Sequence, residues 1–234
     1  YQHHQREVQS VAWNPVETTI LLSGSMDGAV CVLDARQTEV ATQWQLPSEV
    51  ECVAWDPHAP QYLMASTDTG LVQRFDARMG TKSKALFTLD AHTDAVSVVA
   101  ANPGHPDLFL TASHDKTVKV WSLQGQKPAI LATKKLEVGP VFSAAWFMDS
   151  PFVVAVGGQT GKLKIWDARE SDALRAACPA AEEGYSEHSR AVAECEEDID
   201  DSDHEMEDDD EGLSEVDEDE EDEEEPRYIA PDLD

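Results

Sequence analysis

The chain has 234 residues, and its 47 acidic against 17 basic side chains give a formal net charge of −30. Residues 1–172 hold 14 Lys/Arg and 19 Asp/Glu, a net charge of −5, whereas residues 173–234 hold 3 and 28, a net charge of −25. This division predicts a globular body large enough for one core, followed by an acidic segment. The sequence has no apolar run near 18 residues and no Cys/His spacing typical of zinc, so we expect no membrane partner and no metal.

Four segments of the body share one pattern. They read "LLSGSMDGAVCVLDAR" (21–36), "LMASTDTGLVQRFDAR" (63–78), "FLTASHDKTVKVWSLQ" (109–124) and "AVGGQTGKLKIWDARE" (155–170). Each has small residues, a turn and an alternating strand, and each follows a second anchor such as "VAWNP" (11–15) or "VAWDP" (53–57). The closing positions Asp34, Asp76, Ser122 and Asp167 lie 42, 46 and 45 residues apart. This period is the length of one four-stranded propeller blade.

The alternation of apolar and polar residues predicts an all-β fold, because one small sheet cannot bury both faces and must stack on neighbours. We expect about four blades, over residues 1–45, 46–90, 91–136 and 137–170. A linker (171–193), an acidic disordered tail (194–225) and a short terminal segment (226–234) would follow.

The triplet Asp68-Thr69-Gly70 matches the Asp-Thr-Gly motif that contains the catalytic aspartate of pepsin-like proteases. A protease dyad needs two carboxylates sharing a proton, and the chain has one such triplet. The repeat instead places Asp68 in the hairpin turn that also contains Asp27 and Asp115. We therefore interpret all three as turn residues.

The third repeat, from "AHTDAV" (91–96) to "LFLTASHDKTVKVWS" (108–122), resembles the WD-repeat family. This resemblance implies a buried, hydrogen-bonded structural tetrad of His92, Thr111 (or Ser113), Asp115 and Trp121. The other repeats keep only parts of it. One of the adjacent histidines His3 and His4 is expected at the corresponding position of the first blade.

The stretches "VECVAWDPHAPQYLMASTDTGLVQRFDAR" (50–78) and "GPVFSAAWFMDSPFVVAVGGQTGKLKIWDA" (139–168) look like the last blades of the periodic tryptophan proteins. That resemblance implies a nucleolar role in assembly of the large ribosomal subunit and pre-rRNA processing. In those relatives the main acidic stretch precedes the propeller, whereas here it follows. Since the family usually closes with about seven blades, we expect this chain to be the C-terminal part of a longer protein. A self-closed four-bladed ring is the alternative.

Arg36, Arg78 and Arg169 occupy equivalent positions in "LDAR", "FDAR" and "WDAR". One interpretation is that each pairs with a nearby carboxylate. The other is a docking surface, because the motif resembles the WDxR signature of substrate receptors of cullin–RING ubiquitin ligases, and Arg makes forked contacts with acidic groups.

Residues 194–225 contain 23 Asp/Glu and no Lys or Arg. The segment either solubilises the chain or captures basic partners such as ribosomal proteins or histones. Ser202 and Ser214 each have an acidic residue three positions downstream, which is typical of phosphorylation sites for acidophilic kinases. The terminal "PRYIAPDLD" (226–234) regains apolar residues, which are compatible with docking in a groove.

The sequence shows no nucleophile–base pair and no cofactor loop, so we predict no enzyme activity, no cofactor and no small-molecule substrate. The leading hypothesis is a scaffold that binds pre-ribosomal assembly factors in the nucleolus. Contact with RNA would be indirect or weak. A ubiquitin-ligase substrate receptor and a histone-binding chromatin factor remain alternatives.

Overall fold

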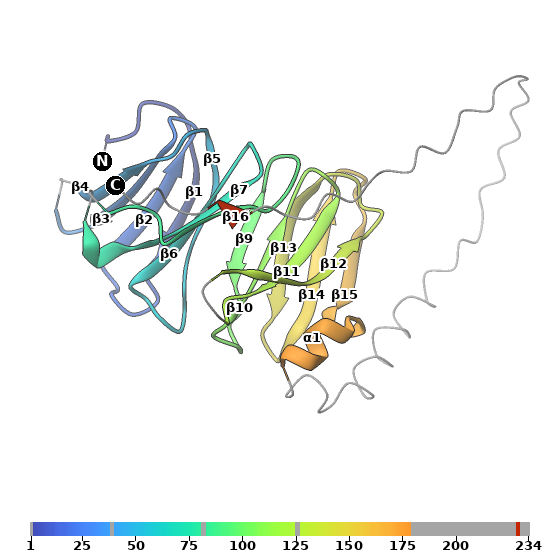
Figure 1. Ribbon diagram of the computed structural model, residues 1–234. Helices are drawn as coiled ribbons and strands as arrows, with labels where there is room; N and C mark the ends of the chain where they lie inside the picture. Colours follow the sequence, from blue (N-terminus) through green and yellow to red (C-terminus); the bar gives the residue numbers. More distant parts are fainter. Residues whose placement is uncertain (1, 38–39, 81–82, 125–126, 179–227, 230–234) are drawn as a thin grey trace, which may run out of the picture.

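The computed structural model describes residues 2–37, 40–80, 83–124, 127–178 and 228–229, and within them the chain is built almost entirely of antiparallel strands. The strands form four sheets that follow one another along the chain, and we call each sheet a blade (Figure 1). No helix in these ranges is long and apolar enough to cross a membrane.

The strands of each blade are hydrogen-bonded in chain order. Blade 1 holds β1 (Val8–Trp13), β2 (Ile20–Ser25), β3 (Ala29–Asp34) and β4 (Val40–Gln45). Blade 2 holds β5 (Val50–Trp55), β6 (Tyr62–Thr67), β7 (Leu71–Asp76) and β8 (Phe87–Asp90). Blade 3 holds β9 (Val98–Ala101), β10 (Leu108–Ala112), β11 (Thr117–Ser122) and β12 (Ala129–Lys135). Blade 4 holds β13 (Val141–Phe147), β14 (Ser150–Gly158) and β15 (Leu163–Asp167).

Two blades depart from the expected four strands. Blade 4 has three strands among the described residues, whereas blade 2 gains a fifth, β16 (Tyr228–Ile229), beside β8. Two 3₁₀ turns, η1 (Ala77–Met79) and η2 (Ala168–Glu170), follow β7 and β15. A short helix, α1 (Asp172–Ala177), then packs against β12 and buries Leu174 completely. The ordered body therefore extends into the range that we assigned to a linker.

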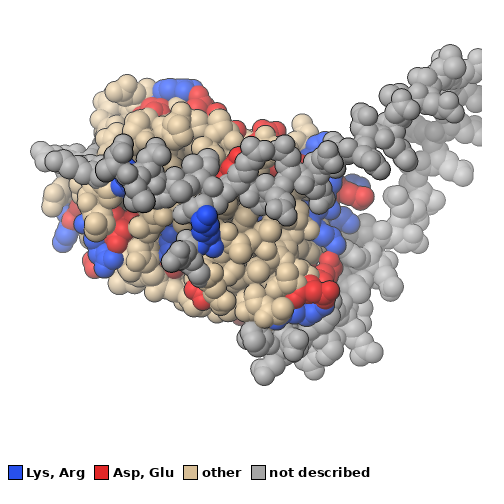
Figure 2. Space-filling model, viewed as in Figure 1, with Lys and Arg blue, Asp and Glu red and all other residues tan. Residues whose placement is uncertain are grey.

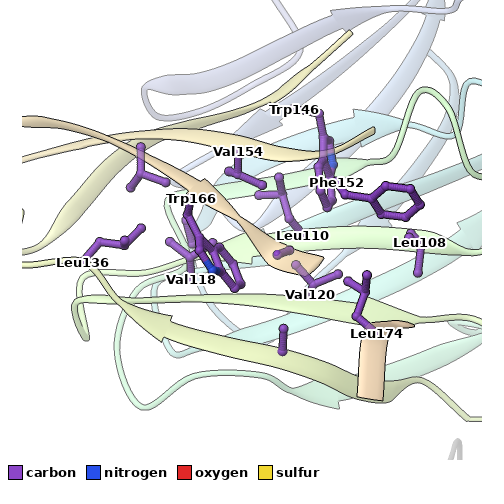
Figure 3. Packing of buried hydrophobic residues seen from close by; sticks show 14 of the residues in the cluster. Leu108, Leu110, Val118, Val120, Leu136, Trp146, Phe152, Val154, Trp166 and Leu174 are labelled. Atoms are coloured by element: carbon purple, nitrogen blue, oxygen red, sulfur yellow. The ribbon is translucent and has the colours of Figure 1, made fainter. Parts of the chain in front are cut away.

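The hydrophobic core lies in three layers between successive blades. Alternate residues of one strand serve opposite layers, because side chains in a strand point to opposite faces in turn. Leu63 and Ala65 of β6 pack toward blade 1, whereas Met64 between them packs toward blade 3. Figure 3 shows the third layer, in which Leu110 and Val120 of blade 3 meet Trp146 of blade 4. Stacking thus buries both faces of the inner blades.

Tryptophans fix the register between blades. The indole N–H of Trp55 in blade 2 donates to the carbonyl oxygen of Ala12 in blade 1, at 3.1 Å. Two blades later, Trp146 of blade 4 donates to the carbonyl oxygen of Ala100 in blade 3, at 3.2 Å. The same contact recurs because the repeats place equivalent residues at equivalent junctions.

The two outer faces of the arc of blades are apolar and exposed. Trp13 has the position in "VAWNP" that Trp55 has in "VAWDP", yet Trp13 is 58% exposed and Trp55 only 7%. The difference follows from packing, since Trp55 lies against a preceding blade and Trp13 lies on the first one. At the other end, Leu163 and Ile165 of β15 are 68% and 37% exposed.

Candidate functional site

The third blade contains a complete polar network, and the structure brings together the four side chains that the WD-repeat resemblance implied. His92 lies just after β8, in the connection to β9. Thr111 is on β10, Trp121 is on β11, and Asp115 is in the turn between β10 and β11. His92 Nε2 is 2.7 Å from Thr111 Oγ1, and His92 Nδ1 is 2.8 Å from Asp115 Oδ2. Trp121 Nε1 donates to Thr111 Oγ1 at 2.8 Å.

The chemistry of the acceptors sets the direction of the protons in this network. An ionised carboxylate only accepts, so His92 Nδ1 carries the proton donated to Asp115. His92 Nε2 then accepts from the hydroxyl of Thr111, which itself accepts from Trp121. Burial lowers the pKa of His92, which keeps the ring neutral as this arrangement requires. Burial alone would raise the pKa of Asp115, but hydrogen bonds from His92 and Thr117 hold it well below its usual range.

Each of the other blades lacks one or more members of this network. By strand register, the position of Thr111 is held by Ser23 in blade 1, Ala65 in blade 2 and Val156 in blade 4. In blade 4 the tryptophan is kept as Trp166, but a valine side chain offers no acceptor. Trp166 Nε1 is accordingly buried without a hydrogen-bond partner.

Blade 1 retains a reduced network around His4, the second histidine of the adjacent pair. His4 Nε2 is 2.8 Å from Ser23 Oγ, and His4 Nδ1 is 3.3 Å from Asp27 Oδ2. Leu33 stands where blade 3 has Trp121. The network therefore ends at Ser23, and apolar packing replaces the indole hydrogen bond.

The three turn aspartates lie in the hairpin turns between the second and third strands. Asp27 and Asp115 have the same geometry, since the Oδ1 atom of each accepts the backbone N–H two residues later, at 2.9 Å. Asp68 lies one position earlier in its turn and makes no such contact in the described structure. Gly70 of this triplet has φ +90°, and a Cβ atom there would lie 1.9 Å from the carbonyl oxygen of His92. The glycine is thus required by backbone conformation and by close packing on the next blade.

The Asp-x-Arg positions form local ion pairs. Each arginine folds back onto the aspartate two residues before it, and in each pair Nη2 and Oδ2 are 2.6 Å apart. The side chains of Arg36 and Arg78 are 71% and 65% exposed, whereas that of Arg169 is 4% exposed. The ion pair with Arg36 lowers the pKa of Asp34 to about 2. Of the three arginines that we considered for partner binding, two reach the surface.

Sequence reasoning missed a second recurrent element at the end of the first strand. Asn14, Asp56 and Asn102 each precede a proline, and the Oδ1 atom of each accepts two backbone N–H groups of the following turn. The side-chain amide of Asn14 also donates across the junction to the carbonyl oxygen of Pro60 in blade 2, at 2.8 Å. The signal was present in the sequence as Asn/Asp-Pro, a known turn initiator.

Where the described residues are visible in Figure 2, they show no concentration of positive charge. Figure 2 shows basic side chains in several separate groups, with acidic ones beside them. Lys119 donates to the carbonyl oxygen of Ala91, and Lys134 pairs with Glu170. Among the described residues no group of three or more His, Cys, Asp or Glu side chains could hold a metal ion.

Two predictions concern parts of the chain outside the described residues. The acidic run 194–225, with Ser202 and Ser214, lies within the undescribed range 179–227. The roles of the acidic run and of both serines remain predictions.

Comparison with known proteins identifies the repeat. The model for "WD domain, G-beta repeat" matches residues 83–122, and that for "Anaphase-promoting complex subunit 4 WD40 domain" matches residues 1–58. The first match begins before β8 of blade 2 and ends with β11 of blade 3. One sequence repeat therefore contributes strands to two neighbouring blades and joins them covalently.

Several curated proteins share the repeats at low identity. Periodic tryptophan protein 1 of Saccharomyces cerevisiae is 26% identical over 185 residues, which is 74% of this chain and 32% of that protein. Its Drosophila melanogaster homologue is 27% identical over 73% of this chain and 38% of its own length. Ribosome biogenesis protein YTM1 of Scheffersomyces stipitis is 31% identical over 36% of this chain and 19% of its own length.

The chain thus spans well under half the length of these relatives. Family models, strand order and the His92–Thr111–Trp121 network all agree on the architecture. The chain contains WD40 repeats, and over about three quarters of its length it is similar to the periodic tryptophan proteins at low identity.

Proposed function

We propose that this chain is a non-enzymatic scaffold in ribosome assembly, acting on the large subunit and pre-rRNA processing in the nucleolus. The observation that carries the proposal is the similarity to periodic tryptophan protein 1 over about three quarters of the chain. The similarity to a protein named for ribosome biogenesis, YTM1, points the same way.

The geometry suits a scaffold because rigid blades present many separate loops. Three buried layers and hydrogen bonds between blades hold the strands, and the turns remain available for binding at the surface. The exposed guanidinium groups of Arg36 and Arg78 add positive charge for acidic partners, although their Nε and Nη2 atoms already bind Asp34 and Asp76.

The acidic run supplies a second mode of binding. Its 23 carboxylates within residues 194–225 attract basic proteins at long range, and salt weakens this attraction. Basic ribosomal proteins fit this chemistry, and so do histones. Since the body itself is mildly acidic, RNA would reach the complex mainly through bound proteins.

Affinity purification of the tagged full-length protein from nuclear extract tests the proposal. Large-subunit pre-ribosomal proteins and pre-rRNA should co-purify, and a fluorescent fusion should accumulate in the nucleolus. Recovery of cullin and its adaptor, or of nucleosomes, in place of pre-ribosomal proteins would refute it. A variant lacking residues 194–225 should lose basic partners at low salt yet keep those bound by the blades.

A further inference from the structure

The C-terminal segment of the chain returns to the body and adds a strand to blade 2. Tyr228 pairs with Leu89 and Ile229 pairs with Thr88, so β16 runs antiparallel to β8 at the outer edge of the sheet. Figure 1 shows β16 against blade 2, far from the helix α1 that packs on blade 3. The pairing joins positions separated by well over a hundred residues.

The local sequence explains why the added strand is short. Pro226 and Pro231 bracket four residues, and proline has no N–H to donate to a sheet. Within the bracket, Tyr228 and Ile229 are residue types with high strand propensity. They follow directly on the acidic run, whose self-repulsion and lack of apolar residues oppose strand formation. The segment is therefore the first after the acidic run that can pair with a sheet edge.

The edge that β16 occupies lacks the protection seen on blade 3. The outer strand of blade 3, β12, carries Lys134 and Lys135 and contacts α1, both of which discourage pairing with a further strand. In contrast, β8 has the sequence Phe-Thr-Leu-Asp, with no lysine. Without β16 the outer backbone groups of β8 would lack partners, so this edge is a template for an extended peptide.

We propose that the outer edge of β8 is a peptide-docking site and that its resident occupant is the chain's own Tyr228–Ile229. A strand of two residues pairs weakly by itself. Because it is tethered to the same body, its effective concentration is on the order of millimolar, which favours occupancy. The acidic run is then attached to the body at both ends, through α1 on blade 4 and through β16 on blade 2.

Site-resolved hydrogen exchange of the full chain tests this site. Replacing Ile229 with proline removes a backbone donor and blocks the extended pairing. Outward-facing amides of Phe87–Asp90 should then exchange about 2- to 10-fold faster, the ratio that corresponds to about one net hydrogen bond. The matched variant Ile229→Ala keeps the N–H and should retain most of the protection. Amides of β6 and β7 should be unchanged in both variants.

A peptide supplied in trans provides the second readout. Adding a synthetic peptide of residues 226–234 at millimolar concentration to a chain truncated after residue 225 should restore protection in β8. Unchanged exchange of β8 in both Ile229→Pro and the truncated chain would overturn the proposal. Loss of protection at β15 instead of β8 would also overturn it, because the docking edge would then be on blade 4.

Discussion

Removing one hydroxyl group from the centre of the blade 3 network should destabilise the fold by several kcal/mol. Thr111 is fully buried, and valine has nearly the same shape, so Thr111→Val changes hydrogen bonding with little change in volume. Two buried groups lose their partner, Trp121 Nε1 and His92 Nε2, which lie 2.8 and 2.7 Å from the hydroxyl oxygen. A buried polar group without a partner costs about 1–3 kcal/mol, so the expected loss is about 2–6 kcal/mol.

Urea unfolding followed by tryptophan fluorescence measures this loss. A loss of about 3 kcal/mol lowers the midpoint by roughly 1.5 M if the urea dependence is about 2 kcal/mol/M. The control is Thr133→Val on the exposed side of β12, which should change stability by less than about 0.5 kcal/mol. If Thr111→Val were as stable as the wild type, the network would contribute nothing net and our reasoning would fail.

Three further predictions concern other polar groups. The converse change, Val156→Thr, gives the orphaned N–H of Trp166 an acceptor and should raise the unfolding free energy by about 1 kcal/mol in the same urea assay; a loss of stability would contradict the register that we infer. Because burial lowers the pKa of His92, the unfolded state takes up a proton near pH 6.5 before the folded state does, so stability should be complete above that pH and fall below it. Thermal melts from pH 8 to 5 check this, and His92→Gln should flatten the profile; an equal slope in both proteins would count against it. Arg169→Ala leaves a buried carboxylate without its partner and should cost about 3–5 kcal/mol, whereas Arg36→Ala at the surface should leave the melting temperature nearly unchanged; equal effects would refute the burial argument.

The repeats and the blade 3 network were predictable because their signals are local. The closing positions of the alternating strands recur every 42 to 46 residues, and the chemistry of the turns does not depend on distant parts of the chain. His92, Thr111 and Trp121 lie within a single repeat, so one resemblance sufficed to place them in a network that the structure brings together.

Features that depend on packing between repeats could not be predicted from the sequences of the repeats. "LDAR" and "WDAR" look equivalent, yet Arg36 lies at the surface and Arg169 is buried. Burial is decided by what packs on each blade, and here α1 follows directly on the turn that contains Arg169.

Strand register and long-range strand pairing likewise could not be predicted from the sequence. The unpartnered N–H of Trp166 becomes evident only when register places Val156 at the acceptor position. The pairing of β16 with β8 connects segments on either side of the acidic run, and nothing in "PRYIAPDLD" indicates which sheet edge it joins. The Asn/Asp-Pro dipeptides could have predicted the turns after the first strands, but our sequence analysis did not use them.

The side-by-side stacking of the blades, on which every argument above depends, is tested most directly by nuclear Overhauser contacts from the tryptophan indole protons. The structure predicts cross-peaks from Trp55 Hε1 to the backbone around Ala12, and from Trp146 Hε1 to the backbone around Ala100. These contacts join residues 43 and 46 positions apart, one blade to the next. Indole protons that showed contacts only within their own blade would contradict the stacked arrangement.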